Sequence, residues 1–210
     1  MNIGDLKKAV ASIAAAMREN RDFLVRLDQR NGDGDLGISM SDGYSAISEL
    51  LAASREVDLG KALAKCSSLF NETAPSTLGT ITSLGLLALA KSLKGKTDVS
   101  LDELASALEF MNSQIMEKAK SRPGDKTILD SLVPAVDALK AHAGEGCEAA
   151  FRAAAEAAAA GSESTAAMRP VHGRAAYYGD SGIGVIDGGS VVGRLIFESV
   201  FRSCAAPEAL

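Results

Sequence analysis

Apolar residues recur three and four positions apart along most of the chain, which is the spacing of one face of an α-helix. Near the N-terminal end the pattern runs through Leu6, Val10, Ile13, Met17, Phe23, Leu24 and Leu27. Strands would show apolar and polar residues in alternation, and such alternation of β-branched residues is nearly absent. The pattern therefore predicts an all-α protein.

Further helices follow from the same periodicity, and several have residues suited to a helix start. We expect them over residues 41–53, 59–70, 77–92, 100–120, 127–143, 145–160 and 189–204. Ser41 opens the first of these, Ser100 and Glu103 match a capping box, and Asp125 is a candidate cap for the helix that follows it. No Pro-rich or Ser-rich linker divides the chain, so we expect a single domain over residues 1–210, a bundle of about eight helices.

Composition and charge narrow the classes of partner. With 47% apolar and 23% charged residues, the sequence has the balance of an ordinary water-soluble domain. A formal net charge of −5, 4% aromatic residues and the absence of tryptophan argue against a nucleic-acid or anionic-membrane partner. No stretch reaches the ~20 apolar residues of a membrane span, and the N-terminal residues lack the apolar core of a secretion signal. We therefore expect a cytoplasmic protein with no nucleic-acid or membrane partner.

Cysteine usage favours the same compartment. Cys66, Cys147 and Cys204 are far apart in the sequence and show no C-x-x-C spacing, which argues against a zinc site. They fall within the apolar pattern of the expected helices. We therefore predict free thiols that act as packing residues in a reducing compartment.

The most distinctive local chemistry lies in "LDQRNGDGDLGIS", residues 27–39, where three aspartates are crowded among turn-forming residues. Asp28, Asp33 and Asp35 repel one another unless solvent or a cation lies between them. Oxygen ligands without a nearby cysteine or histidine suit Mg²⁺ or Ca²⁺. A calcium EF-hand does not fit, because its sixth position would be Leu36 and its twelfth Asp42. A solvated Asp-Gly turn is the remaining alternative.

Three further connections carry groups suited to an anion. "NETAPSTLGT", residues 71–80, places small hydroxyl residues before an apolar helix, where backbone N–H groups attract negative charge. "RPGDKTILD" offers Lys126 to a phosphate and the apolar Ile128 to a base. "GRAAYYGDSGIGVIDGGS" carries Arg174, whose guanidinium is suited to bidentate phosphate binding. Each connection also fits a purely structural role as a helix cap or a surface ion pair.

Taken together, these segments resemble the nucleotide-binding L subunit of dihydroxyacetone kinase, which is also the C-terminal domain of the single-chain ATP-dependent dihydroxyacetone kinases. The matching pieces are "LDQRNGDGDLG", "LGT", "PGDKTILDSLVPAVDAL" and parts of "ESTAAMRPVHGRAAYYGDSGIGVIDGGS". The resemblance implies an eight-helix antiparallel barrel that holds a nucleotide and two Mg²⁺ ions in loops at one end. The metal-binding residues that it implies are Asp28, Asp33 and Asp35. The nucleotide-binding residues that it implies are Leu36, Gly37, Ile38, Ser39, Thr73, Ala74, Thr127, Ile128, Arg174, Asp187, Gly188 and Gly189.

The same resemblance implies a phosphotransferase subunit that uses Mg²⁺ with ADP or ATP. Its phosphoryl group would pass to a small ketone or ketose held by a separate K-type subunit. The nucleotide would be either ATP exchanged at each turnover or ADP recharged by a phosphotransferase-system protein. Neither His142 nor His172 is expected to be the histidine that holds the ketone.

Two departures from the family concern the phosphate side of the site. The family's "GGASGP" is replaced by "NETAPS", residues 71–76, which brings Glu72 and Pro75 into the phosphate loop. Leu36 and Ser39 stand where the family has histidine and asparagine. Two other functions therefore remain open: a non-catalytic regulatory subunit with a degenerate phosphate loop, and a Ca²⁺-stabilised helical domain without a nucleotide.

Overall fold

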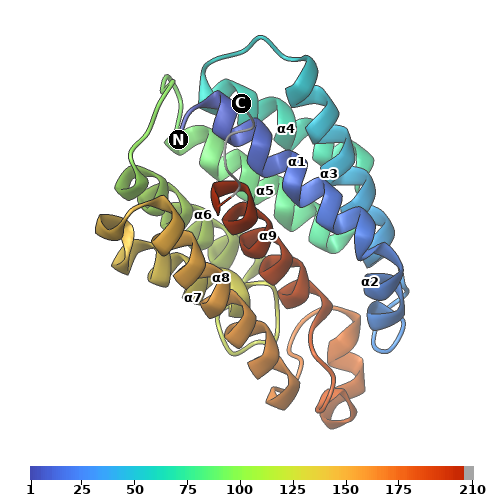
Figure 1. Cartoon of the computed structure of the whole chain (residues 1–210). Helices are drawn as coiled ribbons and strands as arrows, with labels where there is room; N and C mark the ends of the chain where they lie inside the picture. The colour runs from blue at the N-terminus through green and yellow to red at the C-terminus, as the bar shows by residue number, and fades with distance from the viewer. Residues whose placement is uncertain (206–210) are drawn as a thin grey trace.

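The computed structural model describes residues 1–205, and this part of the chain is a bundle of helices without a named strand (Figure 1). The predicted all-α fold is confirmed; the last five residues of the predicted domain, 206–210, lie outside the described residues. The α-helices are α1 (Ile3–Glu19), α2 (Arg21–Asp28), α3 (Leu36–Ala53), α4 (Leu59–Thr73), α5 (Thr77–Ser92), α6 (Leu101–Ala119), α7 (Leu129–Ala141), α8 (Cys147–Ser164) and α9 (Gly188–Ala205). Short 3-10 helices cover Ala143–Glu145, Thr165–Ala167 and Arg174–Gly182.

Eight of these helices close into a ring in the order of the chain. Helix α1 contacts α3, each helix from α3 to α8 contacts the next, and α9 returns to contact α1. Helix α2 is a short addition between α1 and α3, at the end of the bundle where the segment between α8 and α9 also lies (Figure 1). This arrangement confirms the expected eight-helix antiparallel barrel.

The alternation of helix direction decides which connections meet. In a ring whose neighbouring helices run antiparallel, every second connection lies at the same end. Residues 29–35, 74–76, 120–128 and 165–187 are therefore gathered at one end of the barrel. These four connections and the helix ends beside them contain the candidate site.

The interior is filled by the apolar residues that the periodicity places on one face of each helix. Met17, Ile47 and Phe70 are fully buried, and Tyr44 meets the Phe70 ring edge-on at a centroid distance of 5.0 Å. Burial of each large apolar side chain contributes ~1.5–3 kcal/mol to folding. Phe23 is 47% exposed and does not join this core. Among the helices of residues 1–205, none combines enough length and hydropathy to cross a bilayer.

Helix α3 begins at Leu36, five residues before the predicted start at Ser41. The Asp- and Gly-rich composition of the preceding residues is typical of a turn, and the helix starts early because its first turn packs on α2. A Cβ atom at Gly37 would lie 2.1 Å from the carbonyl oxygen of Arg21, so the two backbones approach too closely for any side chain. Leu36–Ser39 therefore form the first turn of a helix that starts beside the acidic residues.

The cysteines only partly follow the prediction. Cys66 is 1% exposed within the core, and burial raises the pKa of its thiol to about 11. Cys147 is exposed, so its predicted packing role is wrong. Its Sγ atom lies 3.1 Å from that of Cys204, which brings together the first turn of α8 and the last turn of α9. This pair lies at the end of the barrel opposite the four gathered connections.

Candidate functional site

The four connections line one cleft of about 810 Å³. Predicted site residues that line it are Asp28, Asp33, Asp35, Leu36, Thr127, Ile128, Arg174, Asp187, Gly188 and Gly189. They come from positions up to 161 residues apart in the sequence (189 − 28). The structure thus brings the acidic turn, the start of α7, the arginine and the start of α9 into one place.

Five of the predicted nucleotide-binding residues do not line the cleft: Gly37, Ile38, Ser39, Thr73 and Ala74. Ala74 is buried at the end of α4, and the Thr73 hydroxyl donates to the carbonyl oxygen of Leu69 at 2.8 Å within the same helix. In this connection the cleft is lined by Asn71, Pro75, Ser76 and Thr77 instead. Glu72, one of the two departures from the family's phosphate loop, is also absent from the lining.

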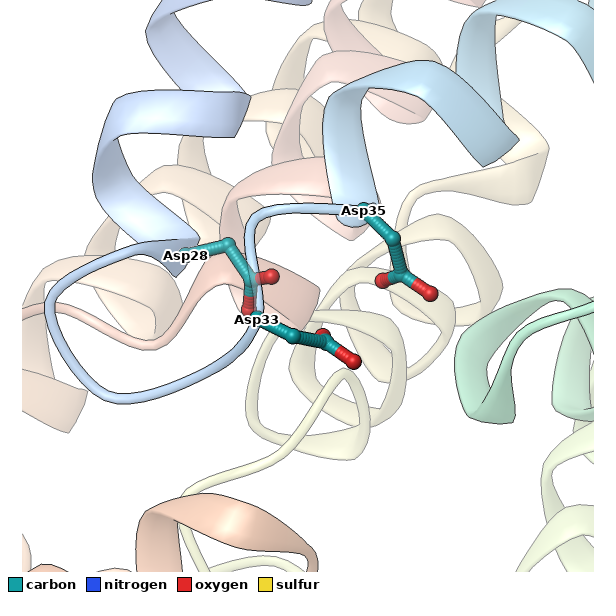
Figure 2. Close-up of side chains that lie close together, drawn as sticks. All are labelled: Asp28, Asp33 and Asp35. Atoms are coloured by element: carbon teal, nitrogen blue, oxygen red, sulfur yellow. The ribbon is translucent and has the colours of Figure 1, made fainter.

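The three aspartates of the acidic turn form a compact cluster (Figure 2). Asp28 is the last residue of α2, Asp33 lies in the turn and Asp35 directly precedes α3. One carboxylate oxygen from each lies within 4.8 Å of the others. The turn that achieves this needs Gly34, whose φ is +81° and whose N–H donates to Oδ2 of Asp28 at 2.7 Å. Three hard oxygen donors at this spacing suit a divalent cation such as Mg²⁺ or Ca²⁺.

The electrostatics of the cluster favour a cation. Partial burial, together with the negative charges of Asp33 and Asp28, raises the pKa of Asp35. The guanidinium of Arg174 opposes this shift, since its Nη2 atom lies 2.8 Å from Oδ2 of Asp33. Arg174 therefore forms an ion pair, the structural role that its sequence context also allowed, and this pair joins two connections across the cleft. Three carboxylates against one guanidinium leave an excess of negative charge.

Two helix starts meet beside the acidic turn. Ser76 caps α5, because its Oγ atom accepts from the N–H of Gly79 at 3.0 Å. The same hydroxyl donates to Oγ of Ser39 in the first turn of α3 at 3.1 Å. Ser39 therefore positions the α5 start without lining the cleft. Free backbone N–H groups and the positive ends of two helix dipoles favour an anion here.

The connection before α7 is organised by Asp130, a residue that the sequence reasoning missed. Its carboxylate is 4% exposed and accepts from the N–H groups of Gly124 at 2.5 Å and Thr127 at 2.6 Å. Asp125, the predicted cap, instead accepts from the N–H of Arg122 at 3.0 Å. The missed signal was the spacing of Thr127 and Asp130, which has the capping-box form T-x-x-D.

The start of α9 is held by Asp187. Its N–H donates to the Thr165 hydroxyl at 3.0 Å, and its Oδ2 atom accepts from the N–H of Ser190 at 2.7 Å. Burial, reinforced by the negative charge of Asp130, raises the pKa of Asp187 to about 7, although the Ser190 hydrogen bond and Lys126 act in the opposite direction. The folded protein therefore keeps a proton on Asp187 at pH values where the unfolded chain has released it.

This shift predicts a pH dependence of stability that Asp187→Asn removes. The contribution of Asp187 is largest below pH 4 and is lost as the pH rises to about 7, because the folded-state pKa is the higher one. The asparagine keeps an acceptor for Ser190 without the charge. Thermal melts without nucleotide should show the variant gaining about 1–2 kcal/mol on wild type between pH 4.5 and 8, after allowance for solvent screening. A difference that does not change with pH would contradict the assignment.

Comparison with known proteins agrees with the fold. The sequence pattern of the DAK2 domain matches residues 31–202. The ADP-binding subunit DhaL of the PEP-dependent dihydroxyacetone kinase of Escherichia coli K12 is 28% identical over 89% of each chain. The corresponding subunit of dihydroxyacetone kinase 2 of Listeria innocua is 30% identical, over 85% of this chain and 84% of the relative.

Longer relatives contain the same domain as a part. The L-erythrulose kinase of Pectobacterium atrosepticum is 28% identical to this chain. The aligned region includes 92% of this chain but 35% of that kinase. Crystal structures of C. freundii dihydroxyacetone kinase, native and with AMP-PNP and Mg²⁺, match 94% of this chain with TM-scores of 0.77 and 0.75, at 23% identity. The chain spans about a third of those proteins, at 34% and 33%. The structural match shows a shared fold.

Proposed function

This chain belongs to the DAK2 domain family as a DhaL-type domain, and from that premise we propose that it is the nucleotide-binding subunit of a dihydroxyacetone-type kinase. It would carry a Mg²⁺–adenine nucleotide and deliver a phosphoryl group to a small ketone or ketose. The observation that carries the proposal is the convergence of the acidic cluster, two helix starts and Arg174 on one cleft.

Asp28, Asp33 and Asp35 are the proposed ligands of the metal, for which two ions are expected. Bound Mg²⁺ would neutralise the charge of the polyphosphate. The protein contributes the positions of its own groups. The N–H groups at the starts of α3 and α5 would face the phosphates, and Arg174 would exchange its contact with Asp33 for a phosphate oxygen.

The adenine is proposed to lie against Thr127 and Ile128, with Gly188 and Gly189 closing the other side. All four residues line the cleft, and Ile128, although 5% exposed, contributes apolar atoms to it. Leu36 lines the cleft beside the acidic residues, where the family has a histidine. Gly37 and Ser39 would support the phosphate side from behind, through the close packing of α2 and the hydrogen bond to Ser76.

The phosphoryl acceptor is proposed to be held by a partner, a K-type subunit. His142 contacts Glu145 away from the cleft. His172 lines the cleft, but its Nε2 atom lies 3.0 Å from Oδ2 of Asp125, and we assign both histidines structural roles. The similarity to the ADP-binding subunits of the PEP-dependent kinases of E. coli and L. innocua supports ADP that is held and recharged by a phosphotransferase-system protein, and the proposed location is the cytoplasm. Exchange of ATP at each turnover is the alternative.

Thermal melting with Mg²⁺ and nucleotide tests the binding step. Ligand at about 100 times its dissociation constant should raise the melting temperature by roughly 5–10 °C. Neither Mg²⁺ nor nucleotide alone should reproduce the shift, and a response to Ca²⁺ without any nucleotide effect would contradict the proposal. Phosphoryl transfer to dihydroxyacetone and erythrulose is then measured with a K-type subunit present. Binding without transfer would identify a regulatory subunit instead.

A further inference from the structure

Lys126 is a buried lysine whose ammonium is committed to two backbone carbonyls. Its side chain is 5% exposed, and Nζ donates to the carbonyl oxygens of Gly182 at 2.8 Å and Met168 at 3.1 Å. The residue adopts a φ of +63°, which is unusual for any residue with a side chain. Burying a charge and straining the backbone both cost free energy, so this arrangement requires a compensating role.

The two carbonyls bracket the segment that carries Arg174. Residues 168–182 leave the barrel and return to it, and a hydrogen bond from the N–H of Gly184 to the carbonyl oxygen of Ala166 closes their base at 2.7 Å. Lys126 joins both ends of this segment at a single atom. Much of the segment is exposed: Tyr177 is 91% exposed, and the side chain of Arg174, which reaches Asp33, is 69% exposed, so the segment has little apolar packing of its own.

The neighbouring residue strengthens the same connection. Asp125 contacts the segment twice. Its carbonyl oxygen accepts from the N–H of Val171 at 3.3 Å, and its side-chain Oδ2 atom lies 3.0 Å from Nε2 of His172. Two consecutive residues before α7 thus hold the base of the Arg174 segment. Thr127 and Ile128, the proposed adenine contacts, come directly after them in the chain.

We infer that Lys126 is a positioning residue: its ammonium holds the Arg174 segment on the connection before α7, so that the adenine side and the phosphate side of the cleft are held as one unit. The effect on nucleotide binding rests on the proposed function, whereas the clamp itself does not. Lys126 also lines the cleft, but both observed hydrogen bonds of Nζ go to the ends of the segment, so we expect Lys126 to act through Arg174 and not by touching a phosphate.

Limited trypsin digestion without nucleotide tests the clamp. Arg174 lies in the segment with an exposed side chain and is followed by Ala175, and cleavage after Arg174 should be about tenfold faster in Lys126→Met, which keeps the length of the side chain without its donors. Lys126→Arg, which keeps charge and donors, should restore slow cleavage. Lys120→Met is the matched control, since Lys120 lies in the same connection with a φ of +50° but has an exposed side chain.

Unchanged cleavage after Arg174 in Lys126→Met would overturn the inference. Cleavage within the barrel helices serves as an internal standard for global stability. If Lys126→Met is also cut faster within the barrel helices, the same comparison is made with Lys126→Gln. Glutamine keeps an amide group as a donor, so this variant should destabilise the fold less. Segment-specific cleavage in Lys126→Gln would then support the clamp, and uniform cleavage would overturn it.

A double-mutant cycle on Mg²⁺–ADP affinity separates positioning from direct contact. Lys126→Met should weaken binding about tenfold in the wild-type background and by less than twofold when Arg174 is already methionine. Losses that multiply would show that Lys126 acts independently of Arg174, which overturns the inference. If the wild type itself binds no nucleotide, the proposed function fails and the digestion experiment alone decides on the clamp.

Discussion

Asp35→Asn is expected to abolish Mg²⁺-dependent nucleotide binding while leaving the nucleotide-free protein at least as stable as wild type. The substitution keeps the shape of the side chain and removes one of three negative charges that lie within 4.8 Å of one another. Affinity for Mg²⁺–ADP should fall by roughly 100-fold or more, because a divalent cation loses a charged ligand. Titration calorimetry with and without Mg²⁺ measures this loss.

The free protein should respond in the opposite direction, which distinguishes a ligand site from a structural one. Burial and the charges of Asp33 and Asp28 disfavour the ionised form of Asp35, so its removal relieves repulsion. Stability without ligand should be unchanged or higher by less than about 1 kcal/mol, since the group is exposed to solvent. Asp42→Asn, the same chemical change at an exposed position on α3, is the control and should bind like wild type. Tight Mg²⁺–ADP binding by Asp35→Asn would refute the metal assignment.

Asp130→Ala is expected to destabilise the protein by about 3 kcal/mol, the largest loss of stability among the substitutions considered. The buried carboxylate accepts two backbone hydrogen bonds, and its removal leaves the N–H groups of Gly124 and Thr127 without their partner. Each charge-assisted hydrogen bond of this kind contributes about 1.5–3 kcal/mol. Urea or thermal unfolding measures the change, and nucleotide affinity should fall with it because Thr127 and Ile128 follow this turn.

The matched comparison is Asp125→Ala, which alters the cap that the sequence predicted. Its side chain accepts one backbone hydrogen bond, from Arg122, and contacts His172 at the surface of the turn. A loss of about 1 kcal/mol is expected. If Asp125→Ala were the more destabilising of the two substitutions, the turn would be organised as the sequence first indicated and the role of Asp130 would be wrong.

Helix content was predictable because it depends on contacts within a few residues. Leu6, Val10 and Ile13 were placed on one face by their spacing alone, and all three are buried. The ends of helices were less predictable where the local composition indicates a turn but tertiary packing favours a helix. The start of α3 at Leu36 follows from the close approach of Gly37 to the backbone of α2, a contact that no local pattern reveals.

The same distinction applies to the site. The spacing of three aspartates identified a candidate cation site, because the turn that gathers them is local. It is closed by a hydrogen bond from Gly34 to Asp28, two residues only six positions apart in the sequence. In the connection at residues 71–76 the resemblance pointed to Thr73 and Ala74, yet Ser76 and Pro75 line the cleft. The direction in which α4 ends decides which of these residues faces inward.

By itself, the sequence determined that the chain is helical and where three carboxylates suited to a cation are gathered, because periodicity and turn geometry act over short distances. Only the tertiary structure decided which connections share a cleft, that Arg174 reaches Asp33, and that Lys126 joins Met168 to Gly182. Those contacts depend on the order and direction of eight helices around a closed ring. The packing of buried side chains fixes that arrangement, and it acts between residues far apart in the sequence.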